Sequence, residues 1–324
     1  MIYMLFDNPN DERQMFFLRD SSLNINLIFP KEKSETYYRM FKKCFEMVRH
    51  SKKMDTIICW YDFMGIIVWW ICRVLKEKRR IVVLNLLLKD KKTLKNIIAK
   101  KMYKKALNDP HLIATVTSLY YGEWLNSLLK INKKYFLLHD VYHGNLAGCE
   151  DSDGSKANTV FCGGRNGRDW NLIISVANEM PDIKFVFVMG ENEYIKYKSS
   201  MSSNIRAYRD VSQDYFLKLM NMSTIVAMPL ETQAPAGLIA FYQAATCNKL
   251  IITSDTVTTR EYFLNKRGVL CSNNICEWVN KIRYYLSNKS VAYEMAKQFR
   301  QYLENECSEE CYLEKLNVLL MSRF

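Results

Sequence analysis

Two arginines follow a pair of glycines near the middle of the chain, in a pattern suited to binding phosphate. Residues 159–162 form an apolar run that predicts a buried strand, and Gly163 and Gly164 come directly after it. Glycines at a strand end let an anion approach the backbone closely, because they carry no side chain there. Arg165 and Arg168 add forked donors that keep their charge. This spacing predicts a loop that grips a phosphate group.

A second candidate anion site lies further along the chain, at the predicted start of a helix. Residues 224–228 predict another buried strand, and the apolar spacing of residues 237–246 predicts a helix after it. The first N–H groups of a helix are unpaired and lie at the positive end of its dipole, which favours an anion near Ala236, Gly237 and Leu238. An ordinary strand–helix–strand unit without a ligand is the alternative. Together, the two loops predict a nucleotide diphosphate held between them.

Both stretches resemble the GT-B glycosyltransferases, in particular family 4, the glycosyl transferases group 1 of bacterial surface polysaccharide synthesis. In this family a Gly-Arg…Lys loop after the first strand of the C-terminal domain binds the diphosphate. Gly164, Arg165 and Arg168 are similar to that loop, with arginine in place of lysine and a shorter gap. The resemblance covers residues 155–290. It implies an α/β fold of the GT-B type, in which two Rossmann-like doubly wound domains face a cleft.

The second motif of the family, Glu-x7-Glu, is only partly present. Residues 243–249, QAATCNK, match the family's Glu-Ala-Met-Ala-Cys-Gly-Lys, so Gln243 stands where a glutamate would bind the nucleotide ribose. Pro235 stands at the position of the first glutamate, which in the family faces the donor sugar. The resemblance also implies that the strand-end loop at Val211 holds the base through backbone groups. The missing glutamate leaves open whether the reaction retains or inverts the configuration of the sugar.

These site residues also have structural interpretations. Arg165 and Arg168 could be surface arginines that pair with Asp169 or Glu179. Gln243 could be a buried helix glutamine whose hydrogen bonds are satisfied within the protein. The sequence leaves both alternatives open.

Asp62 is the candidate for acid–base chemistry in the first half of the chain. It lies just past a strand predicted over residues 56–60, at the kind of strand end where ligands bind in doubly wound sheets. There it could act as a base towards an acceptor hydroxyl. Capping of the helix predicted from Met64 is the alternative. His139 and Asp140 form another ionisable pair, but such a pair at a domain crossover is more often structural.

The composition indicates two domains with unequal charge. The chain has 324 residues, of which 49% are hydrophobic, and a net charge of +12. Residues 1–150 hold 26 Lys and Arg against 15 Asp and Glu, whereas the charges of residues 151–324 nearly cancel. A basic first half implies an acidic partner. The sequence has no helix-turn-helix, zinc-finger or RNA-recognition signature, so we expect an anionic membrane surface rather than nucleic acid.

The ten cysteines are scattered, which predicts buried thiols rather than a disulfide framework. The pairs Cys271–Cys276 and Cys307–Cys311 have no histidine nearby and lack the usual zinc spacing, so no metal is expected. The start of the sequence is unlike a signal peptide, and the longest apolar run, residues 63–72, is too short to span a bilayer. These features predict a cytoplasmic protein that is either soluble or peripheral on the inner face of the membrane.

Strands and helices alternate along the chain, which predicts two doubly wound sheets. Residues 144–157 are small and polar and predict a linker between an acceptor-binding domain, residues 1–150, and a nucleotide-sugar-binding domain with terminal helices, residues 151–324. In GT-B proteins the last helix often crosses back to the first domain, and residues 312–321 could do so. Strands are expected over residues 1–6, 25–29, 56–60, 111–116 and 135–139, with one more within residues 80–88, and over residues 159–162, 185–188, 205–208, 224–228, 250–254 and 268–271.

A lysine-rich helix is predicted over residues 90–107. Leu94, Ile97, Ile98 and Met102 fall on one of its faces, and lysines crowd around them. A basic amphipathic helix of this kind can lie in an anionic membrane interface. The alternative is a helix that packs on its domain and carries solvated lysines.

The combined prediction is a glycosyltransferase without metal or other cofactor. It would move a sugar from a nucleotide-diphosphate donor, for which a UDP-sugar is the first expectation, to a polyprenyl-diphosphate-linked saccharide in capsule, O-antigen or exopolysaccharide synthesis. The two arginines and the helix start would stabilise the leaving diphosphate. A non-catalytic GT-B partner subunit is the first alternative, which the missing glutamate favours. A GT-B epimerase is the second, which the four histidines of the chain disfavour.

Overall fold

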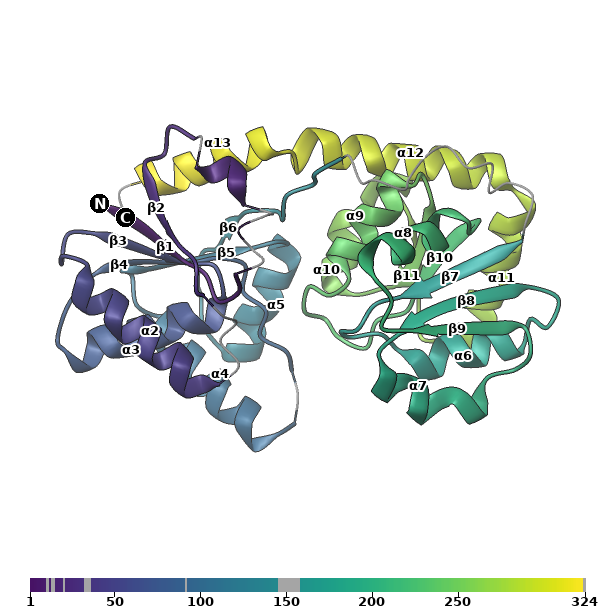
Figure 1. Ribbon diagram of the computed structural model, residues 1–324, viewed down its shortest axis with the longest axis horizontal. Helices are drawn as coiled ribbons and strands as arrows, with labels where there is room; N and C mark the ends of the chain where they lie inside the picture. Colours follow the sequence, from purple (N-terminus) through teal and green to yellow (C-terminus); the bar gives the residue numbers. More distant parts are fainter. Residues whose placement is uncertain are drawn as a thin grey trace. The chain divides into compact units, whose positions relative to one another are not determined.

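The computed structural model shows two compact units (Figure 1). The first unit comprises Met1–Val141 and Glu309–Phe324, and the second comprises Tyr142–Ser308. The described residues are 1–9, 12, 15–19, 21–31, 36–90, 92–144 and 158–322. The predicted linker over residues 144–157 therefore lies outside the described residues, apart from Gly144.

The first unit is built on a six-stranded parallel sheet in the order β2-β1-β3-β4-β5-β6. This order extends the flavodoxin-like arrangement of doubly wound folds by one strand. The inner strands read as apolar runs because helices cover both faces of a sheet of this kind. The strands are β1 (Ile2–Leu5), β2 (Ile25–Ile28), β3 (Thr56–Cys59), β4 (Arg80–Val83), β5 (Leu112–Val116) and β6 (Phe136–Leu137).

The helices of the first unit begin at side-chain caps. Thr36, Thr93 and Ser118 each accept a hydrogen bond from the third N–H of the helix that follows, which satisfies one of its unpaired donors. In Figure 1, α2 and α3 lie on one side of the sheet and α13 lies on the other. The helices are α2 (Tyr37–His50), α3 (Asp62–Val74), α4 (Leu94–Leu107), α5 (Leu119–Leu129) and α13 (Glu309–Met321), with a short 3-10 helix, η1 (Phe16–Leu18).

The last helix, α13, belongs to the first unit by its packing. Tyr312, Leu316 and Leu319 are buried in the hydrophobic core of this unit. The guanidinium of Arg80, on β4, donates to the carbonyls of Leu319 and Leu320, both at 2.8 Å. The boundary predicted at residue 150 grouped all terminal helices with residues 151–324, but residues 312–321 were also expected to cross back to the first domain, and α13 packs there.

The second unit contains another six-stranded parallel sheet, in the order β12-β11-β10-β7-β8-β9. This is the Rossmann order, and it reverses between the neighbouring strands β7 and β10. In doubly wound sheets, ligands bind beyond the carboxyl ends of the strands at such a reversal. The strands are β7 (Thr159–Gly163), β8 (Lys184–Met189), β9 (Ile205–Arg209), β10 (Ile225–Met228), β11 (Leu250–Ser254) and β12 (Val269–Cys271).

Helices of the second unit follow its strands in turn. The helix predicted over residues 237–246 is α9, whereas α7 and α10 were not predicted, because each is too short to show a clear apolar period. The helices are α6 (Trp170–Asn178), α7 (Glu191–Tyr197), α8 (Gln213–Asn221), α9 (Leu238–Thr246), α10 (Val257–Tyr262), α11 (Ile275–Ser287) and α12 (Lys289–Glu306), with 3-10 helices η3 (Lys198–Ser200) and η4 (Leu264–Lys266). The prediction of two Rossmann-like α/β units is confirmed.

Candidate active site

Two loops meet where the strand order of the second unit reverses. The glycine loop, residues 163–169, joins β7 to α6, and the helix-start loop, residues 229–237, joins β10 to α9. Because β7 and β10 are neighbours in the sheet, the two loops leave it side by side. Two backbone hydrogen bonds connect them, from Asp169 N to Pro229 O (2.9 Å) and from Glu231 N to Gly167 O (3.0 Å). The sequence predicted these loops as one site, and the structure places them in contact.

Glycine is required where the loops enclose Arg168. Gly164 and Gly237 have φ angles of 122° and 81°, a backbone conformation that disfavours any residue with a side chain. A Cβ atom added to Gly164 would lie 2.5 Å from Nη2 of Arg168, and one added to Gly237 would lie 3.0 Å from Nη1. The guanidinium of Arg168 therefore lies against both loops at once.

Arg168 is a buried cation without a counter-charge among the described residues. Its side chain donates from Nε to the carbonyl of Gly163 (2.8 Å) and from Nη1 to the carbonyl of Asn166 (3.0 Å), and the residue is only 7% exposed. Burial lowers the pKa of Arg168 and raises the pKa of the neighbouring Cys162 thiol to about 12, so Cys162 stays neutral and offers no negative charge. A desolvated cation held only by neutral carbonyls is costly to maintain, and an anion would relieve that cost.

The start of α9 supplies further donors at the same place. Gly237 is the N-cap of the helix and has no side chain with which to accept from the first N–H groups. Ala236 and Leu238 on either side are buried, and Pro235 before them is half-buried. The structure thus brings together Arg168 and the predicted residues of both loops: Gly163, Gly164, Ala236, Gly237 and Leu238.

Arg165 lies at the edge of this arrangement rather than in it. Its side chain is 71% exposed and donates from Nη2 to Oδ1 of Asp210 at 2.8 Å. Asp210 directly follows β9 and precedes Val211, and its Oδ2 accepts from the N–H of Glu191 (3.2 Å). The pairing that the sequence offered as an alternative, with Asp169 or Glu179, is not the one observed.

Asp210 is a site residue that sequence reasoning missed. Its contact joins the glycine loop to the strand-end loop at Val211, which was predicted to hold the base. The sequence signal was an aspartate directly after one predicted strand and an arginine shortly after another, although β8 lies between the two strands in the sheet. Asp169 instead caps α6, where its Oδ1 accepts from Leu172 N (3.0 Å).

Gln243 lies in the middle of α9 and is buried. No hydrogen bond joins its side chain to another residue in the described part of the chain. Its bond to a ribose hydroxyl stays a prediction.

Asp62 has its hydrogen bonds within the first unit. It is the first residue of α3, where its Oδ1 accepts from Phe63 N and its Oδ2 accepts from Leu87 N and Tyr103 Oη, each at 2.8 Å. Burial raises the pKa of this carboxyl although the three hydrogen bonds act in the opposite direction. The geometry supports a structural tether between α3, α4 and the segment after β4. The assignment of Asp62 as a base stays a prediction.

Asp140 belongs to a second polar cluster of the first unit. Its Oδ1 accepts from Nδ2 of Asn85 (2.8 Å), and Asn85 in turn exchanges hydrogen bonds with the hydroxyl of Thr115 on β5. Burial raises the pKa of Asp140 to about 6, against the opposing effect of the Asn85 hydrogen bond. These partners make the pair of His139 and Asp140 part of the sheet end, consistent with the structural interpretation.

Metal-ligand clusters and membrane-spanning helices are both absent from the described residues. Among them, no three His, Cys, Asp or Glu side chains are grouped as metal ligands. Within the same residues, no helix combines the length and apolar character needed to cross a bilayer. The cysteines found free there include the buried Cys44, Cys59, Cys72, Cys162 and Cys271.

Comparisons with known proteins give the family of the site. Residues 171–306 match the family described as Glycosyl transferases group 1. The matched segment includes the helix-start loop and Gln243 but begins after the glycine loop. A search of curated proteins by sequence found no match.

Solved structures share the whole fold at low identity. The chain is similar to sucrose-phosphate synthase (tll1590) from Thermosynechococcus elongatus, with a TM-score of 0.78 and 12% identity over 99% of this chain and 98% of that one. It is also similar to Anabaena Alr3699/HepE in complex with UDP-glucose, with a TM-score of 0.73 and 12% identity over 99% and 100%. A glycosyltransferase from Rickettsia africae ESF-5 aligns with a TM-score of 0.66 and 12% identity over 98% and 97%. Residues 171–306 thus match the glycosyl transferases group 1, and the chain shares the GT-B fold of these solved structures.

Proposed function

We propose that this chain transfers a sugar from a UDP-sugar to a saccharide carried on a polyprenyl diphosphate, in capsule, O-antigen or exopolysaccharide synthesis. The observation that carries the donor half of the proposal is Arg168. Its guanidinium is buried between two glycine-containing loops and has only neutral partners among the described residues. A diphosphate at this junction would supply the missing negative charge.

The roles of the site residues follow from that placement. Arg168 and the first N–H groups of α9, near Ala236, Gly237 and Leu238, would bind the two phosphates. Their charge acts most strongly as the bond to the sugar breaks, because negative charge then develops on the leaving diphosphate. Arg165 would add a second, exposed cation. Beyond the phosphates, Gln243 would bond the ribose and the loop at Val211 would hold the base.

The identity of the donor is supported by the neighbours. Alr3699/HepE was solved with UDP-glucose, and the pneumococcal O-GlcNAc transferase GtfA, with a TM-score of 0.57, was solved with UDP and GlcNAc. Pro235 replaces the glutamate that faces the donor sugar in the family, so we propose that the sugar contacts differ from those of the family. The choice between a retaining and an inverting reaction depends on those contacts.

The acceptor half rests on charge. The first 150 residues carry the net positive charge of the chain, which suits an acceptor whose diphosphate lies at the inner face of an anionic membrane. For Asp62 the hydrogen bonds favour a tether over a base. We therefore propose that it supports this unit structurally.

A panel of nucleotide sugars tests the proposal. Saturating UDP-sugar should raise the melting temperature of the protein, because a ligand that binds only the folded state stabilises it. Calorimetry with UDP should then give a dissociation constant, and consumption of the donor should require a lipid-linked acceptor extract. ADP- and GDP-sugars serve as matched controls, because they test whether binding depends on the uracil base of the donor.

A non-catalytic partner subunit is the second candidate, because Pro235 stands in place of a glutamate. Such a protein would neither bind UDP nor consume any donor. Absence of both activities across the whole panel would establish this alternative and remove the transferase proposal.

A further inference from the structure

The N-terminal half of α4 exposes its apolar residues. Leu94 is 74% exposed, and Ile97 and Ile98, one turn further on, are also exposed. The helix packs on its unit through a different set of residues near its C-terminal end: Tyr103, Ala106 and Leu107. The apolar face predicted from the sequence is therefore not the packed face, and it requires another explanation.

The start of α2 presents a second exposed apolar group beside it. Tyr38 is 76% exposed, and Tyr37 and Phe41 are exposed as well. The two helices are joined by Lys95 of α4, whose Nζ lies 4.6 Å from the centroid of the Tyr37 ring. We call these six exposed side chains the two-helix patch: Tyr37, Tyr38, Phe41, Leu94, Ile97 and Ile98.

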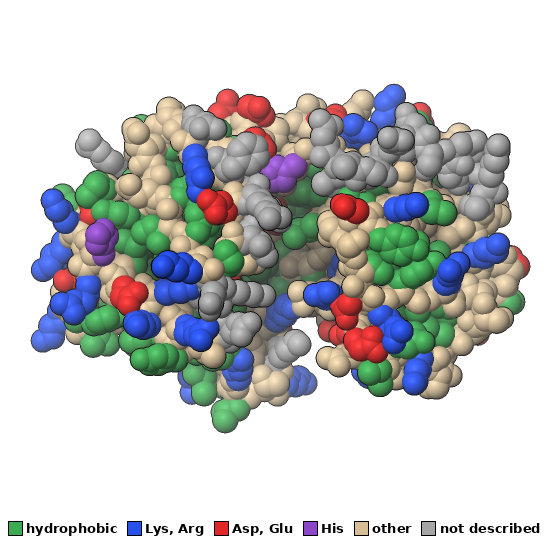
Figure 2. Space-filling model, in the orientation of Figure 1, with side chains coloured by type: hydrophobic (Ala, Val, Ile, Leu, Met, Phe, Trp, Pro, Cys, Tyr) green, Lys and Arg blue, Asp and Glu red, His purple; other side chains and the backbone are tan. Residues whose placement is uncertain are grey.

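Lysines surround the two-helix patch. Figure 2 shows basic and apolar side chains side by side over the part of the first unit where α2 and α4 lie in Figure 1. Acidic partners along α2 and α4 are few: Glu46 lies 3.9 Å from Lys42, and Asp90 pairs with Lys100. The exposed lysines of the two helices are Lys42, Lys95, Lys101, Lys104 and Lys105.

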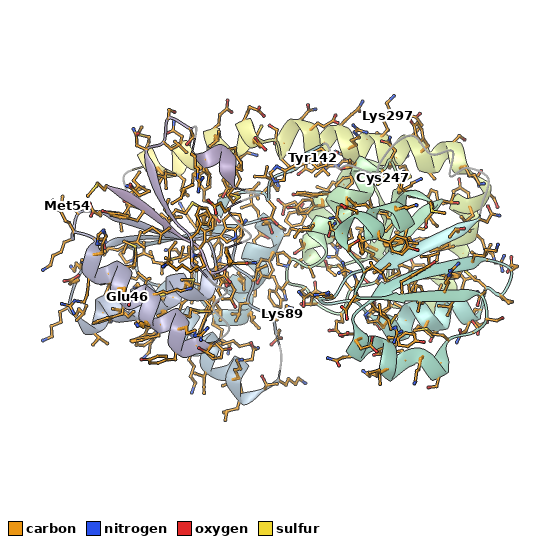
Figure 3. The ribbon with its side chains drawn as sticks, viewed as in Figure 1. Glu46, Met54, Lys89, Tyr142, Cys247 and Lys297 are labelled. Atoms are coloured by element: carbon orange, nitrogen blue, oxygen red, sulfur yellow. The ribbon has the colours of Figure 1, made fainter. Side chains whose placement is uncertain are left out.

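The orientation of α4 is fixed by polar contacts at both ends. Tyr103 Oη donates to the buried Asp62 carboxylate (2.8 Å), which holds the C-terminal half on the unit. Asn96 Nδ2 donates to the carbonyl of Lys89 (2.7 Å), a residue labelled in Figure 3 on the segment before the helix. Thr93 caps the first turn. These contacts keep the two-helix patch turned outward.

We infer that the two-helix patch docks on a lipid surface with anionic headgroups, with the α2 aromatics and the α4 aliphatic side chains entering the interface. Interfacial helices combine apolar side chains of this kind with a lysine-rich surround. The exposed lysines around the patch have few acidic neighbours, and this excess of positive charge is complementary to anionic headgroups. The inference shares one element with the proposed function, which is the anionic membrane as partner. It does not depend on the proposed UDP-sugar site.

Vesicle flotation tests the inference with the full chain. The wild type should bind vesicles of phosphatidylglycerol and phosphatidylcholine, bind weakly to phosphatidylcholine alone, and lose binding as salt rises. Two apolar variants, Tyr38→Ser with Phe41→Ser and Leu94→Gln with Ile98→Gln, should each weaken binding by about tenfold, because each removes two exposed apolar side chains that would enter the lipid interface. The variant Lys95→Gln, Lys101→Gln and Lys104→Gln should weaken it at least about tenfold, because each lysine near an anionic surface contributes binding energy.

Matched controls come from exposed residues of the second unit. Lys218→Gln with Lys297→Gln removes two exposed lysines, and Ile195→Gln with Tyr293→Ser removes two exposed apolar side chains. Both variants should bind vesicles as the wild type does. All variants replace exposed residues, so their melting temperatures should stay close to that of the wild type.

Three outcomes would overturn the inference. Unchanged vesicle binding in both apolar variants would exclude the two-helix patch, and equal binding to neutral and anionic vesicles would exclude recognition by charge. Sedimentation that shows a dimer lost in the apolar variants would assign the patch to a second copy of the chain instead. UDP affinity, measured in parallel, separates the proposals: vesicle binding without UDP binding would remove the donor proposal and keep this one.

Discussion

Asp62 and Arg168 occupy comparable places in the two units, yet their surroundings differ. Each is a buried charged residue just beyond the carboxyl end of a parallel strand, β3 for Asp62 and β7 for Arg168. The carboxylate of Asp62 accepts from three donors of its own unit. The guanidinium of Arg168 meets two backbone carbonyls and no carboxylate among the described residues.

The difference indicates that Asp62 has a structural role and that Arg168 binds a ligand. A buried group whose hydrogen bonds are complete stabilises the packing around it, and removing it leaves its partners unpaired. A buried cation without an anion costs free energy in the empty protein, and that cost falls when an anionic ligand arrives. The comparison therefore predicts opposite effects of substitution on stability and on ligand binding.

Replacement of Asp62 should have the largest effect on stability. Asp62→Ala leaves Leu87 N and Tyr103 Oη without an acceptor, so the free energy of unfolding should fall by about 2–4 kcal/mol in urea titrations. Asp62→Asn keeps one acceptor oxygen, so the free energy of unfolding should fall less in this variant. UDP affinity of the folded variant should match that of the wild type. A variant of normal stability that loses only turnover would break the comparison and support the role of Asp62 as a base.

Arg168 should show the reverse pattern. Arg168→Ala should weaken UDP binding by about 1.5–3 kcal/mol in calorimetry, the range for hydrogen bonds to charged groups. Arg168→Met, which is closer in volume, should leave the free energy of unfolding without nucleotide unchanged or higher, because a desolvated charge is removed. Arg168→Lys keeps the charge without the fork and should bind with intermediate affinity. Wild-type affinity in all three variants would refute the phosphate site.

Asp140 should make the stability of the first unit depend on pH. Its folded pKa of about 6 lies above the ordinary value for aspartate, so between these two values the folded state holds a proton that the unfolded state has released. Stability contributed by this group is therefore present at low pH and declines as pH rises towards 6. The stability difference between wild type and Asp140→Asn should shift by about 2 kcal/mol from pH 4 to pH 7. A difference that stays constant over this interval would show that Asp140 is solvated in the folded protein.

Local patterns in the sequence were sufficient for the fold and for both loops of the site. Strands such as Ile225–Met228 are buried on both faces, so they appear as short apolar runs that end at Pro or Gly. The glycine loop and the helix-start loop were predictable as partners because strand order in a doubly wound sheet brings such loops together. Each of these inferences depends on neighbouring residues along the chain.

What the sequence could not give depends on contacts between distant elements. The pairing of Arg165 with Asp210 requires the register of β7, β8 and β9, which no local pattern specifies. The tether at Asp62 joins α3 to Tyr103 on α4, so a strand-end aspartate looked equally suited to catalysis. Periodicity predicted an apolar face of α4 at Leu94, Ile97 and Ile98, but the helix packs through Tyr103, Ala106 and Leu107 instead, because packing depends on which other elements lie beside it.

The smallest expected effect concerns Arg165, which the sequence ranked equal to Arg168. Arg165→Ala should weaken UDP binding by only about 0.5–1 kcal/mol, because its guanidinium is exposed, screened by salt and already paired with Asp210. Asp210→Asn removes the carboxylate that competes with the nucleotide for Arg165, so UDP affinity should stay equal or rise slightly. When Arg165 is already alanine, the same substitution should change UDP affinity little. A double-mutant cycle by calorimetry measures this coupling. Equal losses for Arg165→Ala and Arg168→Ala would mean that Arg165 leaves Asp210 and joins the buried junction when the nucleotide binds.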